Sequence, residues 1–237
     1  MPWDITNNGQ DGKDGPDITS IPQTAAQGAD GHPANCGWWF TNDDPPGRGN
    51  SGGPGLDGVD APDGTTGSPG GTIEIRVHVL GPSLKIQAKG GAGGNGGKGG
   101  QGGKGGTGGT GGKGLDCEPS AYGGDGGKGG NGGSGGNGGN GSGGGHVYIY
   151  YIEDESESSP PTIDVSAGVP GLGGEGGQPG LGGYAGGAGA YSDYGDTGYE
   201  TGDPPVPGTN GGKGNKGQGG QPGTEGSALI KKVDSLQ

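Results

Sequence analysis

The sequence predicts a mainly β and irregular, elongated protein with essentially no α-helix, in which about six polyproline-II-like legs extend from a small β-sheet base. Three observations predict this architecture. Glycine makes up 74 of the 237 residues, residues 90–114 repeat Gly-Gly-X without a break, and short alternating apolar segments flank the glycine runs. With 23% hydrophobic residues, no apolar core of ordinary domain size can form. Disorder is the alternative for such a composition, but strict triplet phasing favours order.

Two kinds of short strand are expected to build the base. Receiving strands, such as "TIEIRVHVL", end a glycine run and alternate apolar with polar residues. Launching strands, such as "LKIQAKGG", begin the next run. Receiving strands are expected at 72–80, 146–152 and 228–233, and launching strands from Trp3, Leu84 and Thr162. The apolar residues expected in the base are Ile73, Ile75, Val77, Val147, Ile149, Ile163, Val165 and Leu229.

The order of these strands indicates three internal repeats. Each repeat reads as a launching strand, a glycine-rich excursion with a non-glycine interruption near its middle, and a receiving strand. The repeats cover residues 3–80, 83–152 and 161–233 of a single elongated domain. Each excursion is therefore expected to run out along the rod, turn at an apex and return.

Glycine triplets give such legs a packing surface. A chain with three residues per turn rises about 3.1 Å per residue and has no internal hydrogen bonds, so its N–H and C=O groups need partners on neighbouring legs. Two glycines per triplet let the backbones approach closely, and the X residues line the third face. A 25-residue leg would span about 75 Å. Collagen is disfavoured because it needs proline-rich triplets with a single glycine.

The apices carry the residues that the legs lack. Cys36 lies in the first apex and Cys117 in the second, so a rod places both at one end and permits a disulfide in an oxidising environment. In a reducing compartment they would remain free thiols. The aromatic residues expected to form a ligand-binding tip are Trp38, Trp39, Phe40, Tyr122, Tyr191, Tyr194 and Tyr199, with Tyr184 also placed in the third apex. These rings suit either recognition or a hydrophobic plug that seals the rod.

Signals for catalysis, metal binding and cofactors are weak. The histidines, His32, His78 and His146, stand in dissimilar contexts, and no cofactor or metal site is expected. The acidic segment "DGVDAPDG" at 57–64 lacks the spacing of known calcium loops. The protein is therefore expected not to be an enzyme.

Charge and hydropathy restrict the partners. A net charge of -13 argues against nucleic acid, and no apolar run is long enough for membrane insertion. No signal peptide is visible at the start of the sequence. The expected partners are a cell-surface receptor or further copies of this chain, at an extracellular or virion surface.

Strands feeding long Gly-Gly-X excursions, with segments such as "GGYAGGAGAYSDYGDTGYETGD" and "CGWWFTNDD" between them, resemble polyglycine-II adhesins at the tips of T-even-like phage long tail fibres. That resemblance implies a glycine bundle whose end loops recognise a host. "QGADGHP" and "GLDGVDAPDG" are similar to the legs of springtail glycine-rich antifreeze proteins, which implies an ice-binding face that includes Thr107 and Thr110. The strand and glycine alternation also looks like modules of large bacterial surface proteins.

These observations favour a non-enzymatic adhesion rod that recognises a cell-surface ligand through its apex loops. A structural subunit of an extracellular filament, assembled by strand addition, is the alternative. Ice binding is a third hypothesis.

Overall fold

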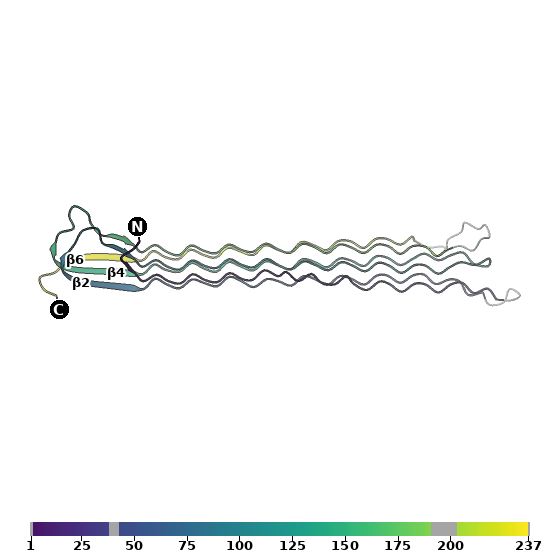
Figure 1. Ribbon diagram of the computed structural model, residues 1–237. Coiled ribbons are helices and arrows are strands. Elements are labelled where there is room, and N and C mark those ends of the chain that lie inside the picture. The colour runs from purple at the N-terminus through teal and green to yellow at the C-terminus, as the bar shows by residue number, and fades with distance from the viewer. Residues whose placement is uncertain (1, 38–42, 191–202, 237) are drawn as a thin grey trace.

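The computed structural model describes residues 2–37, 43–190 and 203–236. Within these ranges the chain has no helix and consists of six short strands and long irregular segments. The strands are β1 (Ile5–Thr6), β2 (Thr72–Leu80), β3 (Lys85–Gln87), β4 (His146–Asp154), β5 (Thr162–Asp164) and β6 (Ser227–Lys232). All six lie at one end of a slender rod, and the irregular segments run along its length (Figure 1).

The strands form two parallel three-stranded sheets whose order follows the internal repeats. The launching strands pair in the order β1-β3-β5 and the receiving strands in the order β2-β4-β6. β2 and β4 match the expected strands closely, whereas the launching strands β1, β3 and β5 are shorter than expected and β6 is shifted by one residue. Parallel pairing follows because equivalent strands of successive repeats run in the same direction: β1, β3 and β5 lead out of the base, and β2, β4 and β6 lead into it.

A small apolar core lies at the base. Ile86, Val147 and Ile149 are fully buried, and Ile73, Leu80 and Ala88 complete the cluster. Four of the other expected base residues, Ile75, Val77, Ile163 and Val165, pack against it partly buried. Leu229 is part of β6 but 44% exposed, so it lies outside this core. Leu80, Ile86 and Ala88 were missing from the expected set, although alternation in "LKIQA" identifies the last two.

The irregular segments are six legs that continue the two sheets as two rows. Legs 1, 3 and 5 (residues 8–35, 88–114 and 165–190) run outward from β1, β3 and β5. Legs 2, 4 and 6 (residues 46–71, 121–145 and 203–226) return to β2, β4 and β6. Main-chain hydrogen bonds join each leg to its neighbours in the same row and in the other row, once every three residues.

Leg 3 illustrates how completely a central leg is bonded. Gly90 N–H donates to Ser166 of leg 5 over 2.9 Å, and Gly91 N–H donates to Ser68 of leg 2 over 2.9 Å. The third N–H of the triplet, that of Ala92, donates to the Asp11 side chain of leg 1 over 2.8 Å. Every donor of the triplet is therefore satisfied without a helix or a sheet.

The glycine content of each leg follows the number of its neighbours. Legs 3 and 4 each bond to four other legs and carry two glycines in nearly every triplet. A Cβ at Gly96 of leg 3 would overlap the carbonyl of Gly136 in leg 4, and one at Gly97 would overlap the carbonyl of Pro16 in leg 1. Leg 1 bonds only to legs 2 and 3 and carries at most one glycine per triplet. Glycine is thus required at positions where a side chain would overlap the backbone of a neighbouring leg.

Leg 1 departs once from this regular pattern. Ile18 N–H donates to Lys98 and the next bond to leg 3 is from Ala25 to Lys104, so leg 1 has one residue more than leg 3 in this interval. The extra residue lies within 19–24, where Ile21 is 71% exposed. On either side the bonds resume their three-residue spacing.

Candidate functional site

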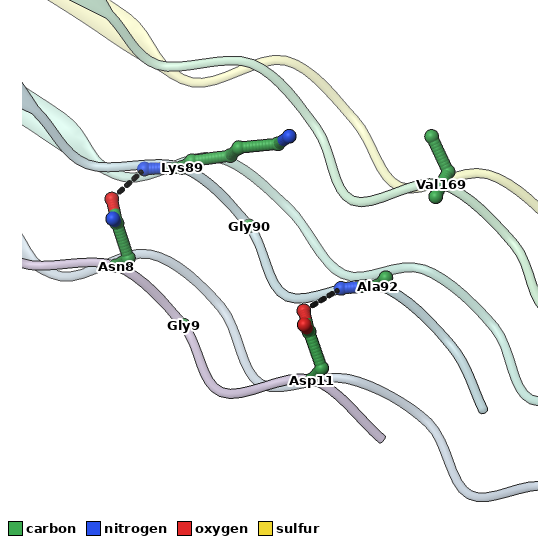
Figure 2. Close-up of a pocket in the computed structure, with 7 residues that line it drawn as sticks. All are labelled: Asn8, Gly9, Asp11, Lys89, Gly90, Ala92 and Val169. Atoms are coloured by element: carbon green, nitrogen blue, oxygen red, sulfur yellow. Dashed lines mark hydrogen bonds between the residues drawn. The ribbon is translucent and has the colours of Figure 1, made fainter. Parts of the chain in front are cut away.

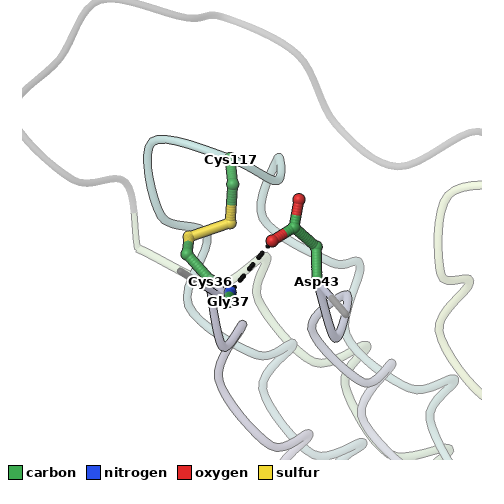
Figure 3. The surroundings of a disulfide bond; sticks show 4 residues. All are labelled: Cys36, Gly37, Asp43 and Cys117. Atoms are coloured by element: carbon green, nitrogen blue, oxygen red, sulfur yellow. Dashed lines mark hydrogen bonds between the residues drawn. A yellow bond between two sulfur atoms is a disulfide. The ribbon is translucent and has the colours of Figure 1, made fainter. Parts of the chain in front are cut away.

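The far end of the rod, opposite the sheets, is held together by a disulfide between the first two apices. The Cys36 and Cys117 Sγ atoms are bonded, and their Cα atoms lie 5.9 Å apart (Figure 3). The first apex closes where Asn35 and Asp44 exchange two main-chain hydrogen bonds of 2.9 and 2.8 Å. Gly37 N–H also donates to the Asp43 carboxylate over 3.0 Å. The necks of the two apices are therefore fixed relative to each other.

Most aromatic residues expected at the tip lie outside the described residues: Trp38, Trp39, Phe40, Tyr191, Tyr194 and Tyr199. Tyr122 lies near the tip at the start of leg 4, partly buried, where its carbonyl accepts a 3.0 Å hydrogen bond from Gly49 N–H. Tyr184 was expected in the third apex, and this is wrong. Its carbonyl accepts a hydrogen bond from Gly108, so it belongs to the regular part of leg 5.

Aspartate and asparagine side chains form a second set of bonds between legs. Asn8 and Asp11 of leg 1 accept from the N–H groups of Lys89 and Ala92 of leg 3, both over 2.8 Å (Figure 2). Further acceptors of this kind are Asp14, Asp17, Asp30, Asp57, Asp60, Asp63, Asn95, Asp125, Asn131, Asn137 and Asn140. Each accepts from the X-position N–H of the next leg in its row, where no backbone carbonyl is available.

This arrangement gives the acidic segment 57–64 a structural role. Asp57 and Asp63 accept from the N–H groups of Asn131 and Asn137 over 2.6 Å each. The carboxylates therefore bond to the backbone of leg 4 rather than converging on an ion. Within the described parts of the chain, no three His, Cys, Asp or Glu side chains are grouped to hold a metal ion.

The described part of the surface includes open depressions between neighbouring legs. One near the base has a volume of about 270 Å³ and is lined by Asn8, Asp11, Lys89, Ala92 and Val169, with the backbone of Gly9 and Gly90 (Figure 2). The Asn8 and Asp11 oxygens that face it already accept hydrogen bonds from leg 3. Asp11 therefore joins leg 1 to leg 3 here, and Lys89 is the other charged residue of the lining.

The perturbed carboxyl groups have structural partners. Hydrogen bonds from Gln87 and then Ser166 lower the pKa of Asp164. Hydrogen bonds from Ser156 lower the pKa of Asp154, and the Lys216 ammonium, 2.7 Å away, lowers that of Glu175. All three shifts favour the charged form, which stabilises the fold and leaves no proton to donate near neutral pH.

The histidines lie apart from one another. His146 Nδ1 lies 2.8 Å from the Ser227 hydroxyl, His78 lies 3.7 Å from Glu153, and His32 is on leg 1. They belong to two base strands and one leg, so they do not form a common site. No helix in the described residues could cross a membrane.

No protein-family model and no curated protein matches the sequence. Among solved structures, a nine polyproline type II helical bundle springtail antifreeze protein from Granisotoma rainieri is similar, with 29% identity. The match covers 82% of this chain and 100% of that chain, at a TM-score of 0.11. The crystal waters of that protein are described as matching the ice lattice. A TM-score of 0.11 does not indicate a shared fold.

Proposed function

We propose that this protein is a recognition rod that presents its apices to a receptor on a cell surface. The observation that carries the proposal is the separation of the two ends: both sheets and the N- and C-terminal residues lie at one end, and the disulfide-linked apices lie at the other (Figure 1). Attachment at the base would leave the apices free. Variable loops on a rigid scaffold are a common arrangement for binding.

We infer that the shaft between these ends is a polyglycine-II bundle, in which each leg has a polyproline-II conformation. Support comes from the three-residue spacing of hydrogen bonds in all six legs and from the overlap that a Cβ would produce at central glycines. A chain with three residues per turn and no internal hydrogen bonds would produce this spacing. Such a bundle would be stiff because each central leg is bonded on several sides.

The edges of the bundle favour an isolated rod over lateral growth. Leg 6 lies 81 residues after leg 4, as in the pairing of His146 with Ser227. The positions of leg 6 equivalent to Gly126, Gly132 and Gly135 are therefore Pro207, Lys213 and Lys216. Proline has no N–H to donate, and the lysine side chains occupy the space that another backbone would need. These residues end the row after three legs.

The test is binding of fluorescently labelled protein to a panel of bacterial and animal cells. Replacing Trp38 and Tyr194 together by Ala should abolish binding without changing the thermal midpoint, whereas replacing Leu172 on the shaft by Ala should leave binding unchanged. Equal binding by the tip variant and the native protein would refute recognition by the apices.

A filament subunit is a second candidate, favoured by the free edge of β6. Among the described residues β6 pairs with β4 on one side and with no strand on the other. All its residues are exposed, and Leu229 and Ile230 are 44% and 42% exposed. An unprotected edge strand can pair with another chain. In that case negative-stain microscopy should show polymers that Leu229→Lys suppresses.

A further inference from the structure

The distal shaft carries an exposed tyrosine. Tyr184 is 68% exposed, and it is the one aromatic residue among the exposed large hydrophobic side chains of the described residues. Other X positions of legs 3 and 5 carry small, polar or aliphatic residues. Because most of this ring lies outside the packed backbones, it contributes little to the packing of the shaft.

The ring is held in place from one side. The Lys104 ammonium of leg 3 lies 4.8 Å from the centroid of the Tyr184 ring, a cation–π contact. Lys104 and Tyr184 therefore restrict each other's rotamers, which lowers the entropy that a ligand would have to remove on binding. The ammonium lies over one face of the ring, and the residue as a whole is still 68% exposed, which leaves surface for a ligand to contact.

Gly187, next to Tyr184 along the same face of leg 5, is a glycine that packing between legs does not require. A Cβ at Gly187, one turn further toward the tip, would meet no atom within 4 Å, in contrast to the glycines buried between legs. This glycine leaves open space beside Tyr184 on the same row. Because no atom would lie near a Cβ at Gly187, there is room for a ligand beside the ring.

Two hydroxyl groups border the same surface. Gly108 and Gly111 of leg 3 donate to the carbonyls of Tyr184 and Gly187, both over 2.9 Å. The residues just before these donors are Thr107 and Thr110, so two threonines lie beside the ring and the open position on the neighbouring leg. The surface thus combines an aromatic face, free space and uncharged hydroxyl groups.

From this combination we propose that Tyr184, Thr107, Thr110 and Gly187 form a binding site for a neutral hexopyranose unit of an oligosaccharide. A pyranose has one face of C–H groups, which packs on an aromatic ring, and a rim of hydroxyls, which bond to groups such as those of threonine. A cationic ligand is disfavoured because Lys104 already occupies one ring face. This proposal rests on the proposed function in one respect: it takes the cell-surface receptor to be a glycan.

The test uses the full disulfide-linked protein with ¹³C-labelled tyrosine, titrated with hexasaccharides of β-1,4-glucose, α-1,4-glucose and β-1,4-N-acetylglucosamine. Binding by one ring stack and a few hydroxyls should be about millimolar. At least one sugar should shift the Tyr184 ring resonance, identified by its loss in Tyr184→Ala. Isothermal titration calorimetry should show affinity reduced about tenfold or more by Tyr184→Ala and retained by Tyr184→Phe.

Gly187→Leu supplies a second variant that keeps the ring. Because the added side chain meets open space and the glycine does not have a positive φ, the thermal midpoint of the rod should not decrease, while the sugar is excluded. Leu172→Ala, on the same row nearer the base, is the matched control and should bind normally. Unchanged affinity in both Tyr184→Ala and Gly187→Leu, or no shift of the ring with any of the three sugars, would overturn the site.

The outcomes separate this site from the proposed function. Cell binding that requires the apex aromatics but survives Tyr184→Ala, together with no sugar binding, refutes the site and leaves the recognition rod intact. Sugar binding at Tyr184 without any cell binding supports the site and refutes adhesion. Concentration-dependent dimers that Tyr184→Ala abolishes, in the absence of sugar binding, would assign the ring to self-association and overturn the proposal.

Discussion

The requirement for glycine should depend on the position of each glycine between the legs, and three Gly→Ala substitutions test this. Gly96 lies in leg 3 against leg 4, where a Cβ would overlap the Gly136 carbonyl. Gly103 lies beside the extra residue of leg 1, where the nearest atoms to a Cβ would be 3.1 Å away. Gly187 faces open space. None of the three has a positive φ, so the substitutions differ mainly in packing.

The expected changes in the free energy of unfolding combine two destabilising contributions and one stabilising contribution. At Gly96, overpacking costs about 1–3 kcal/mol. Weakening of the 2.9 and 2.7 Å hydrogen bonds that legs 3 and 4 form at Gly97 and Gly94 adds about 1 kcal/mol each. Alanine also restricts the unfolded chain, which stabilises by about 0.4–1 kcal/mol. Gly96→Ala should therefore lower the free energy of unfolding by about 3 kcal/mol, whereas Gly187→Ala should raise it by about 0.4–1 kcal/mol.

Urea unfolding and differential scanning calorimetry measure these differences. For a chain of this length, about 3 kcal/mol corresponds to a decrease in thermal midpoint of roughly 6–12 °C. Gly187→Ala should increase the midpoint by a few degrees, and Gly103→Ala should lie between the two. If all three variants had the same midpoint, close contact between backbones would not be the reason for the glycines, and the account of the shaft would be wrong.

Three further predictions concern other contacts. Reducing the Cys36–Cys117 disulfide, which spans 81 residues, should lower the free energy of unfolding by up to about 4.5 kcal/mol, measured as a shift in the urea midpoint; no shift would show that the apices are held by other contacts. Asp14→Leu should cost about 1 kcal/mol by removing the 2.6 Å acceptor of a leg 3 N–H, whereas Asp14→Asn should cost less, and equal thermal midpoints would contradict this role. The lowered pKa of Asp164 means that its stabilising contribution is present above the pKa of the unfolded state and is lost as the pH falls through the lower folded value. Gln87→Leu should therefore reduce the thermal midpoint at pH 7, and its difference from the native protein should shrink below about pH 4; a constant difference across pH would contradict the assignment.

Local patterns predict several elements of the protein. Alternation places β2 and β4, because side chains on a strand point to opposite faces with a period of two. The interruptions of the glycine runs place the first two apices, and Cys36 and Cys117 fall within them. Each of these features repeats over a few residues, so the sequence alone contains the information.

The candidate sites depend more on the tertiary structure. Tyr184 reads as an apex residue because it precedes the tyrosine-rich segment, and only the hydrogen bond from Gly108 places it on the shaft. No pattern near Tyr184 indicates Lys104, because that residue comes from another repeat. Likewise, nothing in the sequence around Asp57 indicates its partner, and only the structure shows that Asn131 N–H of leg 4 donates to it.

The sequence by itself therefore determined that the chain alternates short strands with glycine-phased excursions and that its two cysteines belong to apices. The tertiary structure decided which legs are neighbours and hence which glycines are required: a Cβ at Gly96 would overlap leg 4, whereas Gly187, which also lies in a Gly-Gly pair, faces open space. The physical reason is that each leg bonds to segments that are mostly distant along the chain, such as Gly12 to Ala92. A triplet specifies which face of a leg lacks side chains, but only the packed bundle determines what lies against that face.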